Sequence, residues 1–319
     1  MKQMMWGYLI HLSDNMWGDP GSTIKIAPYF PELSLDESVW RQVMDYLPTQ
    51  GINTVVIDVG DGIQYEKRPE ISVKGAWSKD KLRKELNYIR SLGMTPIPKL
   101  NFSAGHDAWL GEYSRMLSTT PYYEACRDVI TEVVEVFDYP ELIHLGMDEE
   151  DPVNQGGLVF SCVRQGELWW HDMFYLFDVC EKLGVRPWVW ASALWDEKLR
   201  DTYLRKMPKS VLQSNGWYNR IRKLSDGTYK GIQPQTYCIL EEHGFEQVLT
   251  CSTFEGYMYS AEETMQLGKT EIVPERNKGY MTAPWHNTRT NKHFILLNDA
   301  LQFGLAKQSI YPEEWRKER

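Results

Sequence analysis

Leu142-Ile143-His144-Leu145-Gly146 leads directly into Met147-Asp148-Glu149-Glu150-Asp151, and this junction of an apolar run with an acidic cluster guides the interpretation of the chain. The first five residues have the composition of a short buried strand. The acidic residues that follow are typical of the carboxyl end of such a strand, where α/β barrels place their chemistry. A solvated loop or a helix start would explain the same carboxylates, because negative side chains are favourable near a helix N-terminus.

Seven similar β-rich runs occur elsewhere in the 319 residues, and amphipathic stretches separate them. The eight runs are Trp6–Ser13, Asn53–Val59, Met94–Phe102, Leu142–Gly146, Arg186–Ser192, Val211–Trp217, Gln247–Ser252 and Gly279–Trp285. Predicted helices cover Asp36–Thr49, Ser78–Leu92, Tyr122–Phe137, Glu167–Leu183, Asp196–Lys206 and Asn291–Ala306. This alternation predicts an α/β fold, a (β/α)8 TIM barrel formed as a single domain by residues 1–319. An open doubly wound sheet is the alternative, but no strand is followed by a glycine-rich phosphate loop.

The composition restricts the partners that the protein can bind. A net charge of −9 without any basic cluster argues against nucleic acid. The apolar runs are far shorter than the roughly 20 residues that span a bilayer, so we predict no membrane segment. The five cysteines have no CxxC spacing, which argues against a disulfide framework or a structural zinc site. We therefore expect no metal and no cofactor, and the sequence leaves the oligomeric state open.

The N-terminal run Met4–Leu12 contains Gly7 and His11 and lacks a small-residue cleavage site. We interpret it as the first strand and not as a signal peptide. The sequence as it stands then favours a cytoplasmic protein. A periplasmic or secreted location would follow if a signal peptide had been removed.

Polar and aromatic residues follow most of the predicted strands. In a barrel these strand ends meet at one mouth. Asp61 and His106 follow the second and third runs and join Asp148 and Glu149 as candidates for the chemistry. The candidates for substrate binding come from the fifth to eighth runs and are Trp190, Asn215, Trp217, Tyr257, Trp285 and His286. Carboxylates flanked by aromatic rings are typical of a sugar pocket, so the predicted partner is a carbohydrate.

The segment His144–Glu149 resembles the His-x-Gly-Gly-Asp-Glu signature of the family-20 glycoside hydrolases, the β-N-acetylhexosaminidases. Two earlier segments match in the same order. Ile97–His106 resembles the family's Ile-Pro-Glu segment that ends in Pro-Gly-His, and Asp58–Asp61 resembles its His-x-Thr-Asp. Trp217 and Trp285 resemble its pocket tryptophans, and Tyr257 resembles a tyrosine that binds the substrate's acetamido oxygen.

The resemblance implies a glycoside hydrolase that cleaves an N-acetylhexosamine-type glycoside by a retaining, substrate-assisted mechanism. Glu149 would be the general acid and base. Asp148 would hold and polarise the substrate's 2-acetamido group, whose oxygen acts as the nucleophile. His106 would hydrogen-bond Glu149, and Asp61 would orient His106.

Departures from the family pattern concern the part of the pocket that grips the outer hydroxyls of the sugar. The first run is not followed by the family's arginine, and His286 stands where a glutamate is usual. Two other function classes stay open. One is a metal-dependent sugar isomerase or epimerase whose ligands would be His11, Asp58, His144 and Glu149. The other is a non-catalytic carbohydrate-binding barrel, although binding alone needs no acid/base pair.

Overall fold

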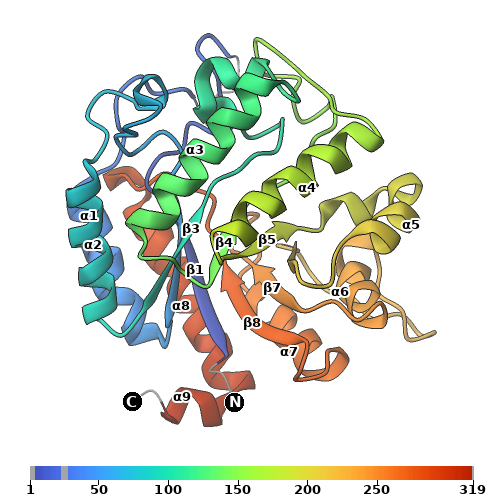
Figure 1. Cartoon of the computed structure of the whole chain (residues 1–319). Coiled ribbons are helices and arrows are strands. Elements are labelled where there is room, and N and C mark those ends of the chain that lie inside the picture. Colours follow the sequence, from blue (N-terminus) through green and yellow to red (C-terminus); the bar gives the residue numbers. More distant parts are fainter. Residues whose placement is uncertain (1–3, 23–27, 318–319) are drawn as a thin grey trace.

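The computed structural model describes residues 4–22 and 28–317, and its centre is a closed barrel of parallel strands (Figure 1). The strands are β1 (Met5–His11), β2 (Thr54–Asp58), β3 (Thr95–Lys99), β4 (Leu142–His144), β5 (Arg186–Trp190), β6 (Leu212–Gly216), β7 (Gln247–Cys251) and β8 (Asn277–Thr282). Each strand pairs with the next in the chain, and β8 closes the barrel against β1. The predicted (β/α)8 TIM barrel is confirmed, with all eight runs as its strands.

Helices surround the barrel on the outside (Figure 1). They are α1 (Glu37–Tyr46), α2 (Lys79–Ser91), α3 (Thr120–Val136), α4 (Glu167–Lys182), α5 (Glu197–Lys206), α6 (Ile232–Glu242), α7 (Ser260–Glu271), α8 (His293–Ile310) and the short α9 (Pro312–Lys317). The six predicted helices are present with somewhat different ends. Helices α6 and α7 were not predicted, because small or polar residues such as Thr236, Ser260 and Thr264 lie on their buried faces and interrupt the apolar pattern. None of the helices in the described part of the chain is both long and apolar enough to cross a bilayer.

Side chains alternate between the inside and the outside of the barrel along each strand. The apolar residues that fill the inside are Leu9, Val56, Ile97, Leu142, Trp188, Trp190, Leu212, Val248, Met281 and Ala283. Two positions further along the first four strands, the same face carries His11, Asp58, Lys99 and His144, which are paired in register from strand to strand. All four are buried. This buried polar layer lies at the carboxyl ends of the strands, where the next inward positions reach the mouth.

The buried polar layer is held together by charge. Lys99 and Asp58 form an ion pair whose side chains are 0% and 2% exposed. Nδ1 of His11 lies 3.5 Å from Oδ2 of Asp58. Burial by itself raises the pKa of Asp58, but Lys99 and His11 outweigh burial, and the pKa stays below its ordinary value. The floor of the mouth therefore contains an ionised carboxylate whose charge is already compensated.

Candidate active site

The backbone turns sharply after β4 and carries the two candidate carboxylates. Gly146, Met147 and Glu149 have φ angles of 71°, 68° and 53°. An L-residue in this left-handed region costs about 1–2 kcal/mol, so contacts from the surrounding structure must hold Met147 and Glu149. Gly146 is required here because a Cβ atom would overlap the side chain of Asn101. The turn gives the carboxylates different settings, with the Asp148 side chain 15% exposed and that of Glu149 41% exposed.

His106 lies between these two carboxylates. Its Nδ1 is 3.3 Å from Oδ1 of Asp148, and its Nε2 is 3.5 Å from Oε2 of Glu149. Burial alone would lower the pKa of His106, but Asp148 and Glu149 raise it to about 10. The imidazole is therefore protonated at neutral pH, and the structure brings three of the four predicted catalytic residues together.

Asp148 is recessed behind Glu149 and is held by two partners. The side-chain amide of Asn101 donates a hydrogen bond to its Oδ1 at 3.0 Å, and His106 faces the same oxygen. Burial by itself raises the pKa of Asp148, but the charge and hydrogen bond of His106 overcome it and hold the pKa at about 2. Asp148 is therefore an ionised acceptor across the physiological range. Asn101 was not predicted, although it continues the inward alternation of Ile97 and Lys99 and could have been found from that parity.

The segment after β3 fixes the backbone on both sides of Glu149. The hydroxyl of Ser103 donates to the carbonyl of Asp148, and the N–H of Ala104 donates to Oε1 of Glu150 at 3.2 Å. Gly105 packs on Glu149 so closely that a Cβ atom on it would lie 2.6 Å from the Glu149 carbonyl oxygen. Residues 103–106 thus hold the turn after β4 in place and also carry His106, which lies between the two carboxylates.

Asp61, the fourth predicted catalytic residue, has different partners from the expected one. It follows β2 and is 2% exposed. Its oxygens accept hydrogen bonds from the hydroxyl of Ser13 and, at 2.9 Å, from the side-chain amide of Asn15. In the described part of the chain, these bonds replace the expected one to His106, because the residues that follow the neighbouring strand β1 already occupy the carboxylate. Burial raises the pKa of Asp61 to about 7, against weaker lowering by Ser13 and Asn15.

Trp285 is the centre of an aromatic group at the mouth. Its ring centroid lies 5.8 Å from that of Trp190, 6.1 Å from Trp17 and 6.0 Å from His11. Trp17 also approaches His106, with a centroid separation of 6.2 Å. Trp190 and Trp285, both predicted to bind substrate, are thus adjacent. The group forms an apolar wall beside the His106 centre.

Tyr218 belongs to this wall. The sequence instead predicts its neighbour Trp217 as a pocket residue. The Tyr218 ring lies 6.4 Å from that of Trp285. Burial raises the pKa of Tyr218, and the charges of Asp148 and Glu149 raise it further, whereas a hydrogen bond with Trp285 lowers it. The indole N–H of Trp217 instead donates to the carbonyl of Arg220 at 3.1 Å. Alternation along β6, continued past its end at Gly216, explains why Tyr218 and not Trp217 joins the wall. Position 218 shares the inward face of Leu212, and position 217 does not.

Two other predicted substrate contacts are occupied by structural bonds. Asn215 accepts from the indole of Trp195 at 3.0 Å and donates to the carbonyl of Gln233 at 2.8 Å, which ties β6 to α6. The hydroxyl of Tyr257 donates to Glu263 on α7 at 2.6 Å. Asn215 lies on the outward face of its strand, and Tyr257 turns towards its own helix. In this structure both side chains are engaged in hydrogen bonds within the fold.

His286 follows Trp285, and its ring contacts that of Phe254 at a tilt of 58° with 5.3 Å between the centroids; Phe254 is 42% exposed. Burial, together with the charges of Lys292 and His11, lowers the pKa of His286 to about 4. The imidazole is neutral at physiological pH. It offers a hydrogen bond at the rim but no positive charge.

Cation binding was considered for the same residues. In the described part of the chain, ligand atoms of His106, Asp148 and Glu149 all lie within 4.8 Å of one another. A metal would have to displace the proton that the two carboxylates stabilise on His106. The alternative set fits less well, because Asp58 is ion-paired with Lys99, and Nδ1 of His144 already accepts from the N–H of Gly146 at 3.0 Å.

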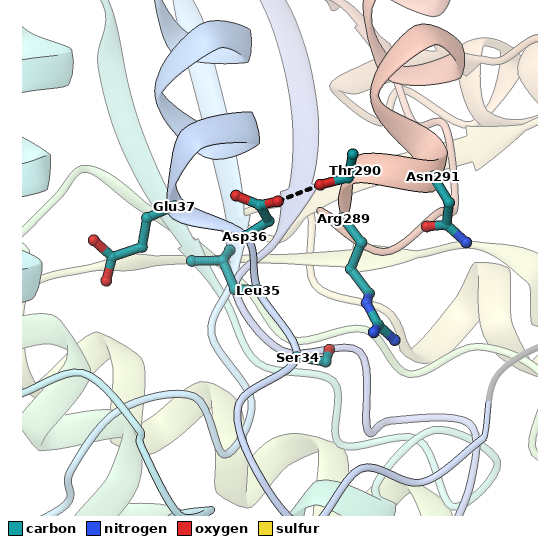
Figure 2. Close-up of a pocket in the computed structure, with 7 residues that line it drawn as sticks. All are labelled: Ser34, Leu35, Asp36, Glu37, Arg289, Thr290 and Asn291. Atoms are coloured by element: carbon teal, nitrogen blue, oxygen red, sulfur yellow. Dashed lines mark hydrogen bonds between the residues drawn. The ribbon is translucent and has the colours of Figure 1, made fainter.

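A separate cavity of about 660 Å³ opens where α1 and α8 begin (Figure 2). It is lined by Ser34, Leu35, Asp36, Glu37, Arg289, Thr290 and Asn291. Asp36 caps α1 through Ser38 and accepts a hydrogen bond from Thr290, so its carboxylate is fully used within the fold. None of the residues around His106 lines this cavity, and we do not assign the chemistry to it.

Comparison with known proteins finds likeness in structure alone. No family model and no curated protein matches the sequence. A GH20 exo-β-N-acetylglucosaminidase from Vibrio harveyi superposes with a TM-score of 0.61 at 14% identity over 99% of this chain. GH20 β-N-acetylhexosaminidases from Streptomyces coelicolor A3(2) and Bacteroides fragilis give TM-scores of 0.63 and 0.62 at 11% and 14% identity, each over 98% of this chain.

These enzymes are longer than the protein described above. The chain spans 58% of the Vibrio enzyme, 70% of the Streptomyces enzyme and 71% of the Bacteroides enzyme. The aligned part is nearly the whole barrel, at identities of 11–14%. This protein therefore shares its fold with the catalytic barrels of the GH20 β-N-acetylhexosaminidases.

Proposed function

We propose that the protein is a glycoside hydrolase that cleaves 2-acetamido glycosides, with Glu149 as general acid and base. The observation that carries the proposal is the position of the His106 imidazole, 3.3 Å from Asp148 and 3.5 Å from Glu149, at the carboxyl end of β4. A charged histidine between a recessed and an exposed carboxylate gives the two acids different tasks. The names of the structural neighbours, all GH20 hexosaminidases, support the same reaction class.

Glu149 has the exposure that a leaving-group acid needs. At 41% exposed it is open to a bound glycoside, whereas its neighbours in the turn are tied into the protein. In the proposed first step, Glu149 gives its proton to the glycosidic oxygen as the bond to the anomeric carbon breaks. In the second step it takes a proton from the attacking water. The imidazolium of His106 beside it stabilises the carboxylate that exists between the two steps.

Asp148 is proposed to act through the substrate. The acetamido oxygen would attack the anomeric carbon and form a cyclic oxazolinium, while Asp148 accepts a hydrogen bond from the acetamido N–H and stabilises the positive charge. A carboxylate with a pKa of about 2 remains ionised for this task. Water then attacks the anomeric carbon from the face that the leaving group has left, which opens the oxazolinium ring. The anomeric configuration is therefore retained. The hydroxyl of Tyr218, whose ring lies 6.4 Å from that of Trp285, replaces Tyr257 as our candidate donor to the acetamido oxygen.

The aromatic wall fits the apolar face of a sugar ring. Trp285, Trp190 and Trp17 provide flat surfaces next to His106, and stacking on such surfaces positions a sugar without charge. His286 stands where the resemblance leads us to expect a glutamate, and Ser13, Asp14 and Asn15 follow β1 in place of the expected arginine. The outer hydroxyls would therefore meet a neutral imidazole at His286, which favours a sugar whose exact identity differs from the usual one.

The proposal is tested with aryl glycosides that differ in the group at C2. The wild-type protein should release the aryl group from 2-acetamido sugars, and Glu149→Gln should lose most of this activity. Purified protein that binds these sugars without cleaving them would indicate a carbohydrate-binding barrel instead. Activity that disappears on chelation and returns with a divalent cation would favour the metal-dependent class.

A further inference from the structure

We propose that Arg164 is a positioning residue for Glu149, and that it acts through Glu150 as a clamp on the turn after β4. This inference rests on the proposed function, because it assigns the clamp to the orientation of the general acid. Arg164 lies near the end of the long β4–α4 connection, far from Glu149 in the sequence. Nothing in the sequence pattern pointed to it.

The guanidinium of Arg164 is enclosed and donates to four places: the β4–α4 connection, α4, the segment after β3, and α3, where Nη1 donates to the Tyr122 hydroxyl at 3.3 Å. Its side chain is 1% exposed. Nε donates to Oε2 of Glu150 at 3.1 Å, and Nη2 donates to Oε1 of the same carboxylate. Nη1 donates to Asp172 on α4 at 3.1 Å, and Nη2 also reaches the carbonyl of Phe102, after β3, at 2.8 Å. The forked pair fixes both the position and the plane of the Glu150 carboxylate.

Glu150 transmits this restraint to the catalytic turn because it follows Glu149 directly. The N–H of Ala104 donates to the same carboxylate at 3.2 Å, so Glu150 is held from both the β3 side and the α4 side. On the other side of Glu149, Ser103 and Asn101 hold Asp148. Glu149 itself has a φ of 53°, and its side chain faces Nε2 of His106 at 3.5 Å. Its unfavourable backbone conformation is thus maintained by its two neighbours.

The ion pair of Arg164 and Glu150 also joins the two ends of the long loop between them. Residues 151–163 lie between Glu150 and Arg164, and they include Val153 and Val159, which are 87% and 60% exposed. Without the clamp, motion of this exposed loop would act directly on Glu150 and hence on Glu149. With it, the Glu150 carboxylate is tied to α4 through a buried ion pair, while the loop contacts the Glu150 backbone carbonyl through the side-chain amide of Gln155 at 3.4 Å.

The test is Arg164→Lys, which keeps the charge and removes the fork, measured with a 2-acetamido glycoside that has a poor leaving group. A displaced general acid should lower kcat on the order of 10²-fold while KM changes little. The decisive measurement repeats the substitution in a Glu149→Gln background. If Arg164 acts through Glu149, the second substitution should cause little further loss. Equal loss with and without Glu149 would overturn the proposal in favour of a purely structural role.

The control is Arg276→Lys, because Arg276 makes the same fork on Glu241 just before β8, at the opposite end of the barrel. It should lower thermal stability and leave kcat unchanged. If Arg164→Lys does not fold, Glu150→Gln serves as the second variant, since it keeps the volume and weakens the fork. The same non-additive loss with Glu149→Gln is expected, and additive loss overturns the clamp. Failure of Glu149→Gln alone to impair hydrolysis would refute the proposed function, whereas an active Arg164→Lys beside an impaired Glu149→Gln would refute the clamp alone.

Discussion

The Nδ1 atom of His106 lies 3.3 Å from Oδ1 of Asp148, and this contact couples the charges of the two residues. Each holds the other in its ionised form, with the pKa of His106 raised to about 10 and that of Asp148 lowered to about 2. Glu149 shares the same imidazole through Nε2 at 3.5 Å. The centre therefore has a fixed charge on Asp148 and a second, more exposed carboxylate on Glu149.

The first prediction concerns this charge coupling. Replacing His106 by Gln removes the positive charge that lowers the pKa of Asp148, so burial will raise that pKa above about 2. The acid limb of the pH profile of kcat/KM should move to higher pH. His243→Gln, at an exposed histidine on the C-terminal end of α6, is the matched control and should leave the profile unchanged. An acid limb that does not move in His106→Gln would mean that Asp148 is not the group that this limb reports.

The second prediction concerns the leaving group. Glu149→Gln keeps the shape of the side chain and removes its proton, so hydrolysis of glycosides with poor leaving groups should fall about 10²- to 10⁴-fold. Activated aryl glycosides need less protonation and should lose less in the bond-breaking step. Steady-state kinetics on a series of phenols of different pKa measures this. An equal loss across the series would show that Glu149 does not protonate the leaving group.

The third prediction concerns the pH dependence of stability. The pKa of Asp61 is about 7 in the folded protein against an ordinary value of 3.8, so the folded protein holds a proton that the unfolded chain releases in this window. Stability should therefore decline as the pH rises from about 4 to 7, by at most about 4 kcal/mol. Asp61→Asn removes the titration and should flatten this part of the curve in urea unfolding. Parallel curves for the variant and the wild type would contradict the assignment.

The fourth prediction concerns the turn after β4. Gly93 and Gly146 both have left-handed φ angles, of 81° and 71°, but Gly93 has open space around it while a Cβ on Gly146 would overlap Asn101. Gly93→Ala should cost only the conformational energy, about 1–2 kcal/mol. Gly146→Ala should lose more stability and also most activity, because Asn101 holds Asp148. Urea midpoints and kcat measure both effects, and equal losses of stability in the two variants would contradict the clash.

The strand pattern predicted the barrel because its apolar runs are short, regularly spaced and followed by polar residues. Local sequence was sufficient to predict that Asp148 and Glu149, which follow β4 directly, lie close to His106 after β3. It was insufficient for Asp61, whose partners Ser13 and Asn15 come from the neighbouring strand. Such a pairing depends on how the loops after two different strands pack together. Residue spacing within one segment therefore cannot predict it.

Side-chain alternation accounts for the different directions of the aromatic and amide candidates on β6. Counting from the inward Leu212, Tyr218 faces the mouth, whereas Asn215 and Trp217 face away from it. Parity counted along each strand would have found Tyr218 and Asn101 and excluded Asn215. Trp17 and Arg164 lie in long connections, where neither period nor spacing applies. Only the folded chain brings them to the centre.

The fifth prediction tests the central claim, that Asp148 acts through the substrate's acetamido group. A thiazoline analogue of the cyclised sugar resembles the charged intermediate and should bind the wild-type protein far more tightly than the parent sugar. Asp148→Asn removes the charge that stabilises this intermediate, so the preference for the thiazoline over the parent sugar should decrease sharply. The measurement is the ratio of the two dissociation constants in the wild type and in Asp148→Asn. A large ratio that collapses in the variant is the result we predict, whereas a ratio near one in the wild type, or one that Asp148→Asn leaves unchanged, would contradict the account.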